Sequence, residues 1–342
     1  MKNILQMIFS IKNNDDKKHK TITIIGIRIN LKKIKKTLKY NPFGLIVDTT
    51  MLCNNNCSFC WRHSNPEYLK ECNEKYKIKT MPFEIFKKII DDACQYDSIK
   101  WFTCCGPMGE PLLNENIEKF YEYAFSKNHF NSLTINTNGL AIDKKNISKL
   151  LNSITEFSIS VDSIIPETYE KIHGHKNINK IIENIKLLVE YKKNHGCLAN
   201  IIVRFTENDL NRGQIDDFVK FFKDAGVDGV NYCQEHSFAG VNTNIIDEKS
   251  KYTCKHPREI LNFDFLGNLT TCCLNWHMQP IFGNIKYKSI KQMWESNIKQ
   301  TWNDKTRFNQ NPCLYCSAAE SSIAAKTRSK RITFKNKETI NG

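Results

Sequence analysis

The sequence predicts an α/β protein built around a parallel sheet. Between residues 45 and 235, short apolar runs alternate with stretches whose apolar positions recur at helical spacing, for example Ile181, Ile185 and Leu188. This alternation is typical of repeated β-α units, in which successive strands lie parallel. With 342 residues, 40% of them hydrophobic and 25% charged, the chain can form one large domain and a smaller one.

The repeated part predicts six strands and the helices between them. The strands are expected at residues 44–50, 98–105, 132–137, 156–162, 199–205 and 228–233. The helices are expected at residues 82–96, 114–128, 144–153, 178–194 and 213–226. Loops after the carboxyl ends of such strands build the active site. We therefore expect the site in the polar and cysteine-bearing stretches that follow the strands.

The pattern changes near residue 245, where a second and smaller domain is expected. A hairpin is predicted at 259–273 and a helix around 289–296, and a cysteine pair ends the segment. We divide the chain into a basic N-terminal hairpin, a β-α domain, a cysteine-bearing domain and a basic tail. These parts cover residues 1–41, 42–243, 244–316 and 317–342.

Positive charge is concentrated at the two ends of the chain. The net charge is +14, and residues 1–41 carry eleven Lys or Arg against two Asp, while residues 317–342 carry six against two Glu. The body is nearly neutral, so RNA binding has little support and no nucleic-acid partner is expected. The mixture of apolar and basic residues in the first 40 positions suits an anionic membrane surface, or a partner enzyme working there.

The cellular setting is expected to be the cytoplasm. No apolar run reaches the roughly 18 residues that span a bilayer, and no small-residue cleavage site follows the short apolar stretch at the start. We expect a cytoplasmic protein whose basic ends can contact the inner membrane surface. In that setting, fourteen cysteines indicate metal ligands, reactive thiols and core residues rather than disulfides.

Three cysteines, Cys53, Cys57 and Cys60, follow the first strand with the spacing CxxxCxxC. Thiolates at this spacing can hold an iron–sulfur cluster with one open iron, while a zinc knuckle and core cysteines are the alternatives. Because Phe59 stands before the last cysteine, the segment resembles the signature of the radical S-adenosyl-L-methionine (SAM) superfamily. The resemblance implies a partial (β/α)6 barrel and a [4Fe-4S] cluster on these cysteines that binds SAM.

Later strand ends carry further motifs that resemble the same family. Gly109, Glu110 and Pro111 match its GGEP element. The resemblance implies a SAM-binding set of Phe59, Gly109, Glu110, Asn138, Ser160, Asp162 and Arg204. In this set Glu110 would accept the amino group of SAM and Arg204 would bind its carboxylate. The resemblance also implies reductive cleavage of SAM to a 5′-deoxyadenosyl radical, with an electron donor such as flavodoxin or ferredoxin.

The C-terminal cysteines resemble the SPASM extension of radical SAM maturases, or its shorter twitch form. Cys272 follows Gly267 in a GxxxxC pattern, and residues 281–296 resemble the "GNI…sl…iW" stretch of that extension. The resemblance implies an auxiliary [4Fe-4S] cluster held by Cys254, Cys272, Cys313 and Cys316. A structural zinc on the same four cysteines is the alternative. Cys273 is expected to be a spare thiol beside this site.

The candidate catalytic residues lie at strand ends and in the loop after the sixth strand. They are Cys105, Cys233, Glu235 and His236. A thiol there can donate a hydrogen atom to a substrate radical, as in family members that invert a stereocentre, although buried cysteine is commonly inert. Glu235 and His236 can bind substrate or accept a proton, with an ordinary solvated loop as the alternative. Of the other cysteines, Cys94 and Cys197 are expected in the core and Cys72 in a polar insertion.

The sequence therefore predicts a radical SAM enzyme of the oxidoreductase or epimerase type. The leading hypothesis is that it epimerises or oxidises a sugar in surface-polysaccharide synthesis, because the basic leader resembles those of some bacterial lipopolysaccharide and capsule glycosyltransferases. A ribosomally made peptide or a protein is the alternative substrate, since many proteins with this extension mature peptides. A zinc-stabilised binding protein attached to membranes by its ends is the hypothesis from another class.

Overall fold

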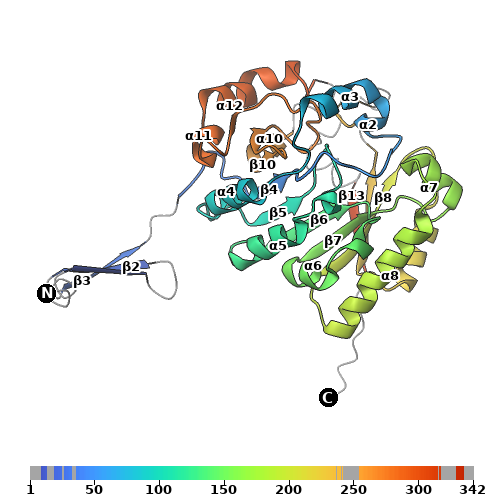
Figure 1. The fold of residues 1–342 in the computed structure, drawn as a ribbon, viewed down its shortest axis with the longest axis horizontal. Helices are drawn as coiled ribbons and strands as arrows, with labels where there is room; N and C mark the ends of the chain where they lie inside the picture. The colour runs from blue at the N-terminus through green and yellow to red at the C-terminus, as the bar shows by residue number, and fades with distance from the viewer. Residues whose placement is uncertain are drawn as a thin grey trace.

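In the part of the chain that the structure describes, the fold is centred on a ten-stranded sheet (Figure 1). The structure is a computed structural model that describes residues 9–13, 19–24, 27–32, 36–235, 237–239, 241, 254–314, 316 and 329–334. Six consecutive strands of this sheet are β4 (Gly44–Val47), β5 (Trp101–Cys104), β6 (Ser132–Thr137), β7 (Glu156–Ser160), β8 (Asn200–Glu207) and β9 (Gly229–Gln234). Each pairs in parallel with the next. The predicted α/β fold with six parallel strands is confirmed.

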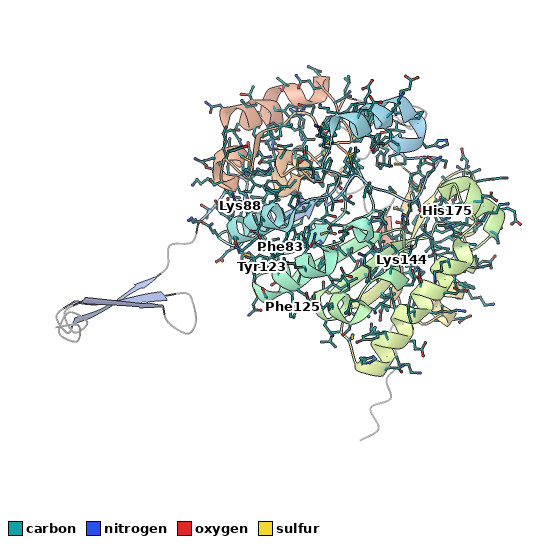
Figure 2. All side chains as sticks on the ribbon, viewed as in Figure 1. Phe83, Lys88, Tyr123, Phe125, Lys144 and His175 are labelled. Carbon is teal, nitrogen blue, oxygen red and sulfur yellow. The ribbon has the colours of Figure 1, made fainter. Side chains whose placement is uncertain are left out.

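Helices connect the parallel strands as the sequence predicts. The five expected helices are α4 (Phe83–Ala93), α5 (Ile117–Ser126), α6 (Ile147–Ser153), α8 (Ile178–His195) and α9 (Ile215–Asp224). Ile181, Ile185 and Leu188 of α8 are fully buried, so the apolar spacing did mark the face that packs on the sheet. Figure 1 shows α5, α6 and α8 side by side along the sheet. Helices α4 and α5 also contact each other, because Phe83 and Tyr123 pack edge to face with ring centroids 5.4 Å apart (Figure 2).

In the described residues between β4 and β9, three further helices were not predicted from the sequence. They are α2 (Trp61–Ser64), α3 (Pro66–Lys75) and α7 (Pro166–His173). Cys72 lies in α3, within the segment expected to be a polar insertion, but Cys72 itself is only 2% exposed. The helix is polar overall, and its few apolar positions were too sparse to indicate a buried face. Short 3₁₀ turns also lie at Pro111–Leu113 and Ile142–Lys144.

The cysteine-bearing C-terminal segment extends the same sheet. Strands β10 (Ile260–Phe263) and β11 (Asn268–Thr270) form the predicted hairpin, and β12 (Gly283–Asn284) follows β11. Strand β10 pairs in parallel with β4, so this segment continues the sheet of the β-α part. The boundary near residue 244 therefore stays a prediction.

Helices and turns complete the C-terminal segment. They are α10 (His256–Glu259), α11 (Ile290–Trp294), α12 (Asn297–Thr301), a π-helical turn at Trp302–Thr306 and a 3₁₀ turn at Arg307–Asn309. Helix α11 confirms the helix expected around 289–296, and Ser289 and Gln292 form a capping box at its start. Trp276 stacks on Trp61 with ring centroids 5.6 Å apart, which packs this segment against the helix that follows the cysteine loop.

Both ends of the chain contribute strands. Strands β1 (Phe9–Asn13), β2 (His19–Ile24) and β3 (Ile27–Lys32) form an antiparallel sheet of their own, which Figure 1 shows apart from the rest. The sequence predicted a hairpin in this part of the chain, and the structure describes three antiparallel strands there. At the other end, β13 (Ser329–Thr333) pairs with β9, so part of the predicted basic tail is an edge strand. Among the described residues, no helix has the length and apolar character to cross a membrane.

Candidate active site

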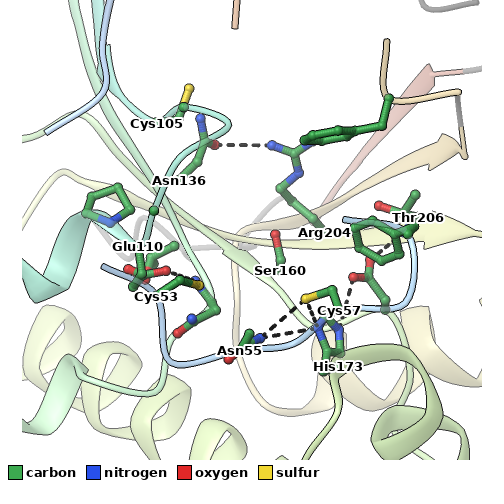
Figure 3. A pocket seen from close by; sticks show the side chains of 18 of the residues that line it. Cys53, Asn55, Cys57, Cys105, Glu110, Asn136, Ser160, His173, Arg204 and Thr206 are labelled. Atoms are coloured by element: carbon green, nitrogen blue, oxygen red, sulfur yellow. Dashed lines mark hydrogen bonds and ion pairs between the residues drawn. The ribbon is translucent and has the colours of Figure 1, made fainter. Parts of the chain in front are cut away.

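A cavity of about 310 Å³ lies where the carboxyl ends of β4 to β9 meet (Figure 3). It is lined by twelve of the predicted site residues, namely Cys53, Cys57, Phe59, Cys105, Gly109, Glu110, Asn138, Ser160, Asp162, Arg204, Cys233 and Glu235. Parallel strands present their carboxyl ends at one edge of the sheet, and this explains why residues far apart in the chain share the cavity. His236 lies outside the described residues.

The cysteine loop follows β4 and forms one wall of the cavity. Cys53 and Cys57 line the cavity, and the backbone N–H of Cys60 donates to the Cys57 carbonyl at 3.0 Å. Burial raises the pKa of the Cys53 thiol to about 11 and that of Cys60 to about 12. Buried thiols of this kind become thiolates when a metal supplies positive charge. The three thiols of this short loop are in electrostatic contact with one another, which suits the donor set of an iron–sulfur cluster.

A histidine that was missed in the sequence contacts this loop. The Nδ1 of His173 lies 3.3 Å from Cys57 Sγ, and its Nε2 lies 3.2 Å from the Asp162 carboxylate. Burial alone would lower the pKa of His173, but the Cys57 thiolate and the Asp162 carboxylate outweigh it and raise the pKa to about 10. Figure 3 shows Asn55, Cys57 and His173 grouped on one side of the cavity. The only signal in the sequence was the HGH stretch at 173–175, which has no recognised spacing to the cysteines.

The loop after β5 brings a buried carboxylate to the cavity. The side chain of Glu110 accepts hydrogen bonds from the Asn138 N–H at 2.7 Å, the Leu112 N–H at 3.0 Å and the Thr137 hydroxyl at 2.5 Å. Burial raises the pKa of Glu110, although the Thr137 and Asn138 hydrogen bonds oppose that rise. Gly109 allows the loop after β5 to lie close to the backbone of the cysteine loop, because a Cβ at this position would lie 2.4 Å from the Thr50 carbonyl oxygen.

The ends of β6, β7 and β8 supply polar groups opposite the cysteine loop. Arg204 donates to the side-chain oxygen of Asn136 at 3.3 Å, and Ser160 lies on the strand between them. The side chain of Asn138 donates to that of Asn54 at 2.6 Å, which ties the β6 end to the cysteine loop. One carboxylate oxygen of Asp162 accepts a hydrogen bond from the Thr206 N–H at 2.6 Å, and the other lies 3.2 Å from His173 Nε2. Asp162 therefore lines the cavity while its carboxylate contacts protein groups.

Three thiols outside the cysteine loop also line the cavity. They belong to Cys105, Cys233 and Cys273. Burial raises the pKa of Cys105, against the opposing effects of Asn136 and Arg204, so this side chain is held as the S–H form. The sulfur of Cys233 lies 3.6 Å from the Thr206 hydroxyl. Cys273 interacts electrostatically with Cys254 and Cys316, in line with the expectation that it lies beside the auxiliary site. Its place in this cavity was not predicted.

The four predicted auxiliary ligands gather in the C-terminal segment. Cys272 interacts electrostatically with Cys313 and Cys316, and Cys313 interacts with Cys254. These cysteines come from three stretches that precede β10, follow β11 and follow the last 3₁₀ turn. Four thiols from separate stretches suit a cluster that links them. In the part of the chain that the structure describes, no three His, Cys, Asp or Glu side chains are arranged to hold a single metal ion.

Two buried cations lie beside these cysteines. The ammonium of Lys299 donates to the Pro257 carbonyl at 2.8 Å and lies over the Phe282, Trp294 and Trp302 rings. Burial lowers the pKa of Lys299 to about 7. Arg307 donates to the carbonyl of Cys254 at 2.9 Å. Positive charges here favour an anionic group of thiolates.

Two family models match this chain, and together they define its class. Residues 47–221 match the Radical SAM superfamily and residues 254–317 match an iron-sulfur cluster-binding domain called SPASM. The first match covers more than half of the chain, and it contains the cysteine loop and most of the cavity. The protein is thus an iron–sulfur enzyme that belongs to the radical SAM superfamily. With its C-terminal domain it is a radical SAM enzyme of the SPASM class, and its cofactors are SAM, a [4Fe-4S] cluster and an auxiliary cluster.

Curated relatives share only part of this chain. It is 24% identical over 185 residues to the "Probable GTP 3',8-cyclase" of Methanocaldococcus jannaschii, covering 54% of this chain and 56% of that protein. It is 26% identical over 195 residues to the "Antilisterial bacteriocin subtilosin biosynthesis protein AlbA" of Bacillus subtilis, covering 56% of this chain and 39% of that protein. The chain thus spans about half the length, or less, of these relatives.

Solved structures share the fold. SuiB of Streptococcus suis bound to the precursor peptide SuiA has a TM-score of 0.60 and 15% identity, with 80% of this chain and 69% of that chain covered. BtrN in complex with AdoMet and 2-DOIA has a TM-score of 0.53 and 16% identity, with 83% of this chain and 94% of that chain covered. At these identities the likeness concerns the fold alone.

Proposed function

We propose that Cys53, Cys57 and Cys60 hold the SAM-binding [4Fe-4S] cluster and that SAM binds in the adjoining cavity. The convergence of Cys53 and Cys57 with Glu110 and Arg204 on one cavity supports this assignment, and Cys60 is hydrogen-bonded to Cys57 through the backbone. Glu110 receives the amino group of SAM and Arg204 its carboxylate, because each offers the opposite charge. When bound, the cluster and SAM supply a carbon radical that removes a hydrogen atom from the substrate.

Other residues of the cavity have supporting roles in this proposal. Gly109 lets the backbone of its loop approach the ligand, while Phe59, Asn138 and Ser160 line the rest of the SAM site. Asp162 affects the SAM site by its contact with His173, because both of its carboxylate oxygens contact protein groups. In the second domain, Cys254, Cys272, Cys313 and Cys316 hold the auxiliary cluster.

The proposed reaction is epimerisation of a sugar carbon, and the observation that carries it is the pair of thiols at Cys105 and Cys233 in the cavity. After the substrate carbon has lost its hydrogen atom, a thiol S–H returns one to the other face. The sulfur radical that remains is restored to the thiol by one electron from a donor such as flavodoxin or ferredoxin and by one proton from the solvent. Glu235 lies at the same cavity and can bind a substrate hydroxyl.

The proposed substrate is a sugar of surface-polysaccharide synthesis. The resemblance of the basic leader to that of polysaccharide glycosyltransferases supports it, since such a leader would bring the enzyme to an anionic membrane surface where those enzymes work. If no thiol returns a hydrogen atom to the substrate, the outcome of the same reaction is oxidation of the sugar. A peptide substrate is the second candidate, because the relatives include a bacteriocin biosynthesis protein and a structure bound to a precursor peptide.

Incubation in heavy water tests this function. The anaerobically reconstituted enzyme is supplied with SAM, a reductant and candidate nucleotide sugars, and we expect one deuterium per product molecule because the exchangeable S–H delivers it. Cys105→Ala is expected to form 5′-deoxyadenosine while deuterium incorporation falls to background. The matched control is Cys94→Ala, which removes a thiol outside the cavity.

Other isotope patterns would contradict parts of the proposal. Deuterium that enters a co-purified peptide, with none in any nucleotide sugar, would establish the peptide maturase instead. A sugar product without deuterium would indicate oxidation. Unchanged incorporation in both Cys105→Ala and Cys233→Ala would show that neither thiol delivers the hydrogen atom.

A further inference from the structure

We propose that Asp48 is the proton donor that restores the Cys105 thiol after each turnover, acting through a water molecule in a second, smaller cavity. The inference deepens the proposed function and rests on it in one respect, the role of Cys105 as a hydrogen-atom donor. After Cys105 has given up its hydrogen atom, one electron from the electron donor converts the sulfur radical to a thiolate. The thiolate then needs one proton, which a carboxyl group near the sulfur can supply.

Asp48 and Cys105 follow two strands that lie next to each other in the sheet. Strands β4 and β5 pair in parallel, with Val47 opposite Cys104. Asp48 and Cys105 are the next residues along these two strands, and side chains at matching positions leave the same face of a sheet. A Cβ at Gly106 would lie 2.3 Å from Cγ of Asp48, so the carboxyl group packs against the backbone directly after Cys105.

The smaller cavity connects the two side chains. Its volume is about 10 Å³, room for about one water molecule, and its lining includes Asp48, Cys105 and Asn275. The side chain of Asn275 is 3% exposed, and neither its amide nitrogen nor its amide oxygen has a hydrogen-bond partner among the described residues. Because a buried amide without partners costs free energy, a water molecule bound between Asn275 and Asp48 would stabilise this arrangement.

The surroundings of Asp48 favour the protonated carboxyl group. Asp48 is 5% exposed, and its burial raises its pKa well above the usual value. The Met108 N–H, which donates to the carboxyl group at 3.0 Å, opposes this rise, as do the Thr50 N–H and the charge of Arg62. The Asp264 carboxylate adds to the rise, because two negative charges close together repel each other. A protonated carboxyl group can donate a proton, whereas a carboxylate only accepts.

The proton transfers balance without a further reactant. The Cys105 thiolate takes a proton from the water while the water takes one from Asp48, so the water is unchanged and Asp48 is left as a carboxylate. Asp264 can return a proton to Asp48, because it follows β10 on the other side of β4 and burial raises its pKa to about 6. The solvent then replaces the proton of Asp264. This path reaches the sulfur from the smaller cavity, while the substrate occupies the larger one.

Hydrogen–deuterium exchange of the Cys105 S–H group tests the path, because the same path carries hydrogen in both directions. The anaerobically reconstituted enzyme, with SAM bound, is transferred into heavy water, and its S–H stretching band is followed by infrared spectroscopy. The Cys105 band is identified by its absence in Cys105→Ala. Asp48→Asn keeps an acceptor for the Met108 N–H. We expect it to slow the exchange about a hundredfold, the lower end of what a positioned acid contributes.

Asp92→Asn is the matched control. Asp92 is a half-buried carboxyl group whose pKa is also raised by burial, but it accepts from the Ile290 N–H and lines neither cavity. Exchange at Cys105 should keep the wild-type rate in this variant. The same spectra give a second readout, since the wild type at neutral pH should show the C=O band of a protonated carboxyl group that Asp48→Asn lacks.

A second variant decides the matter if Asp48→Asn does not fold. Asn275→Leu removes the amide that would hold the water, changes the size of the side chain little and leaves Asp48 in place. We expect slower exchange at Cys105 again. Bound iron of about eight atoms per chain checks that the neighbouring auxiliary site is intact.

The direction of the change separates a proton path from a merely structural role, because a loosened structure would speed the exchange. A rate in Asp48→Asn equal to or above that of the wild type would overturn the inference, since solvent in the larger cavity would then supply the proton. The wild-type rate in Asn275→Leu, or a wild type without the carboxyl band, would overturn it as well. Unchanged deuterium incorporation into the product of Cys105→Ala would instead overturn the role of Cys105 in the proposed function, so the two failures are distinguishable.

Discussion

Replacing both Cys313 and Cys316 with alanine is expected to lower the iron content from about eight to about four atoms per chain. The physical reason is that a cluster with four thiolate ligands cannot be held by the two that remain. Because the four cysteines come from three separate stretches, the cluster links those stretches, and its loss should also lower the unfolding temperature of the C-terminal segment. Iron analysis and calorimetry measure the two effects. SAM should still perturb the spectrum of the remaining cluster.

The control for this double variant is Cys94→Ala combined with Cys197→Ala. These substitutions also remove two thiols, but both positions lie outside the two cysteine groups. Cys94 lies at the end of α4, and Cys197 lies beside Asn152. The control should keep about eight irons. A Cys313→Ala and Cys316→Ala variant that retained all of its iron, or lost zinc instead, would contradict an auxiliary iron–sulfur cluster at this site.

Gly109→Ala is expected to lower both stability and SAM binding. The added Cβ would lie 2.4 Å from the Thr50 carbonyl oxygen and 2.5 Å from that of Leu52. These are backbone atoms, which cannot rotate away, so the loop must shift and strain the 2.7 Å hydrogen bond from the Glu110 N–H to Leu52. Overpacking costs about 1–3 kcal/mol, and we expect a loss near the upper end of that range. Displacement of Glu110 should raise the Kd for SAM about tenfold or more.

Gly213→Ala is the matched control. Gly213 has a positive φ, of 82°, and no atom lies within 4 Å of a Cβ added there. It should lose about 1–2 kcal/mol of stability from the left-handed backbone alone and bind SAM as the wild type does. Denaturant unfolding and SAM titration compare the two variants. Wild-type SAM affinity in Gly109→Ala would show that the loop after β5 is not part of the SAM site.

Local patterns carried most of the fold prediction. Strand β4, with the sequence GLIV, is a short apolar run because all four of its residues are buried. The apolar residues of α8 repeat at helical spacing because one face of that helix is buried. The cavity was predictable from the order of the motifs along the chain, because motifs that follow successive parallel strands must meet at one edge of the sheet. By that rule, Cys53, Glu110 and Arg204 belong to one site because each follows or ends a strand of the same sheet.

Contacts between distant segments were not predictable in this way. His173 lies 116 residues from Cys57, and their contact depends on where the end of α7 meets the cysteine loop. The pairing of β10 with β4 likewise depends on which sheet edge is free, and the hairpin sequence does not encode that. Cys273 follows a predicted ligand directly, but only the packing of the chain turns its side chain towards the cavity shared with Cys105.

The central claim is that Cys53, Cys57 and Cys60 hold the SAM-binding cluster beside a second, auxiliary one. The most direct test compares iron content and electron paramagnetic resonance, after anaerobic reconstitution, between the wild type and a variant carrying Cys53→Ala, Cys57→Ala and Cys60→Ala. We predict that about eight irons fall to about four and that SAM perturbs only the wild-type spectrum. Zinc in place of iron in the wild type, or a triple variant that keeps eight irons and still responds to SAM, would contradict the claim.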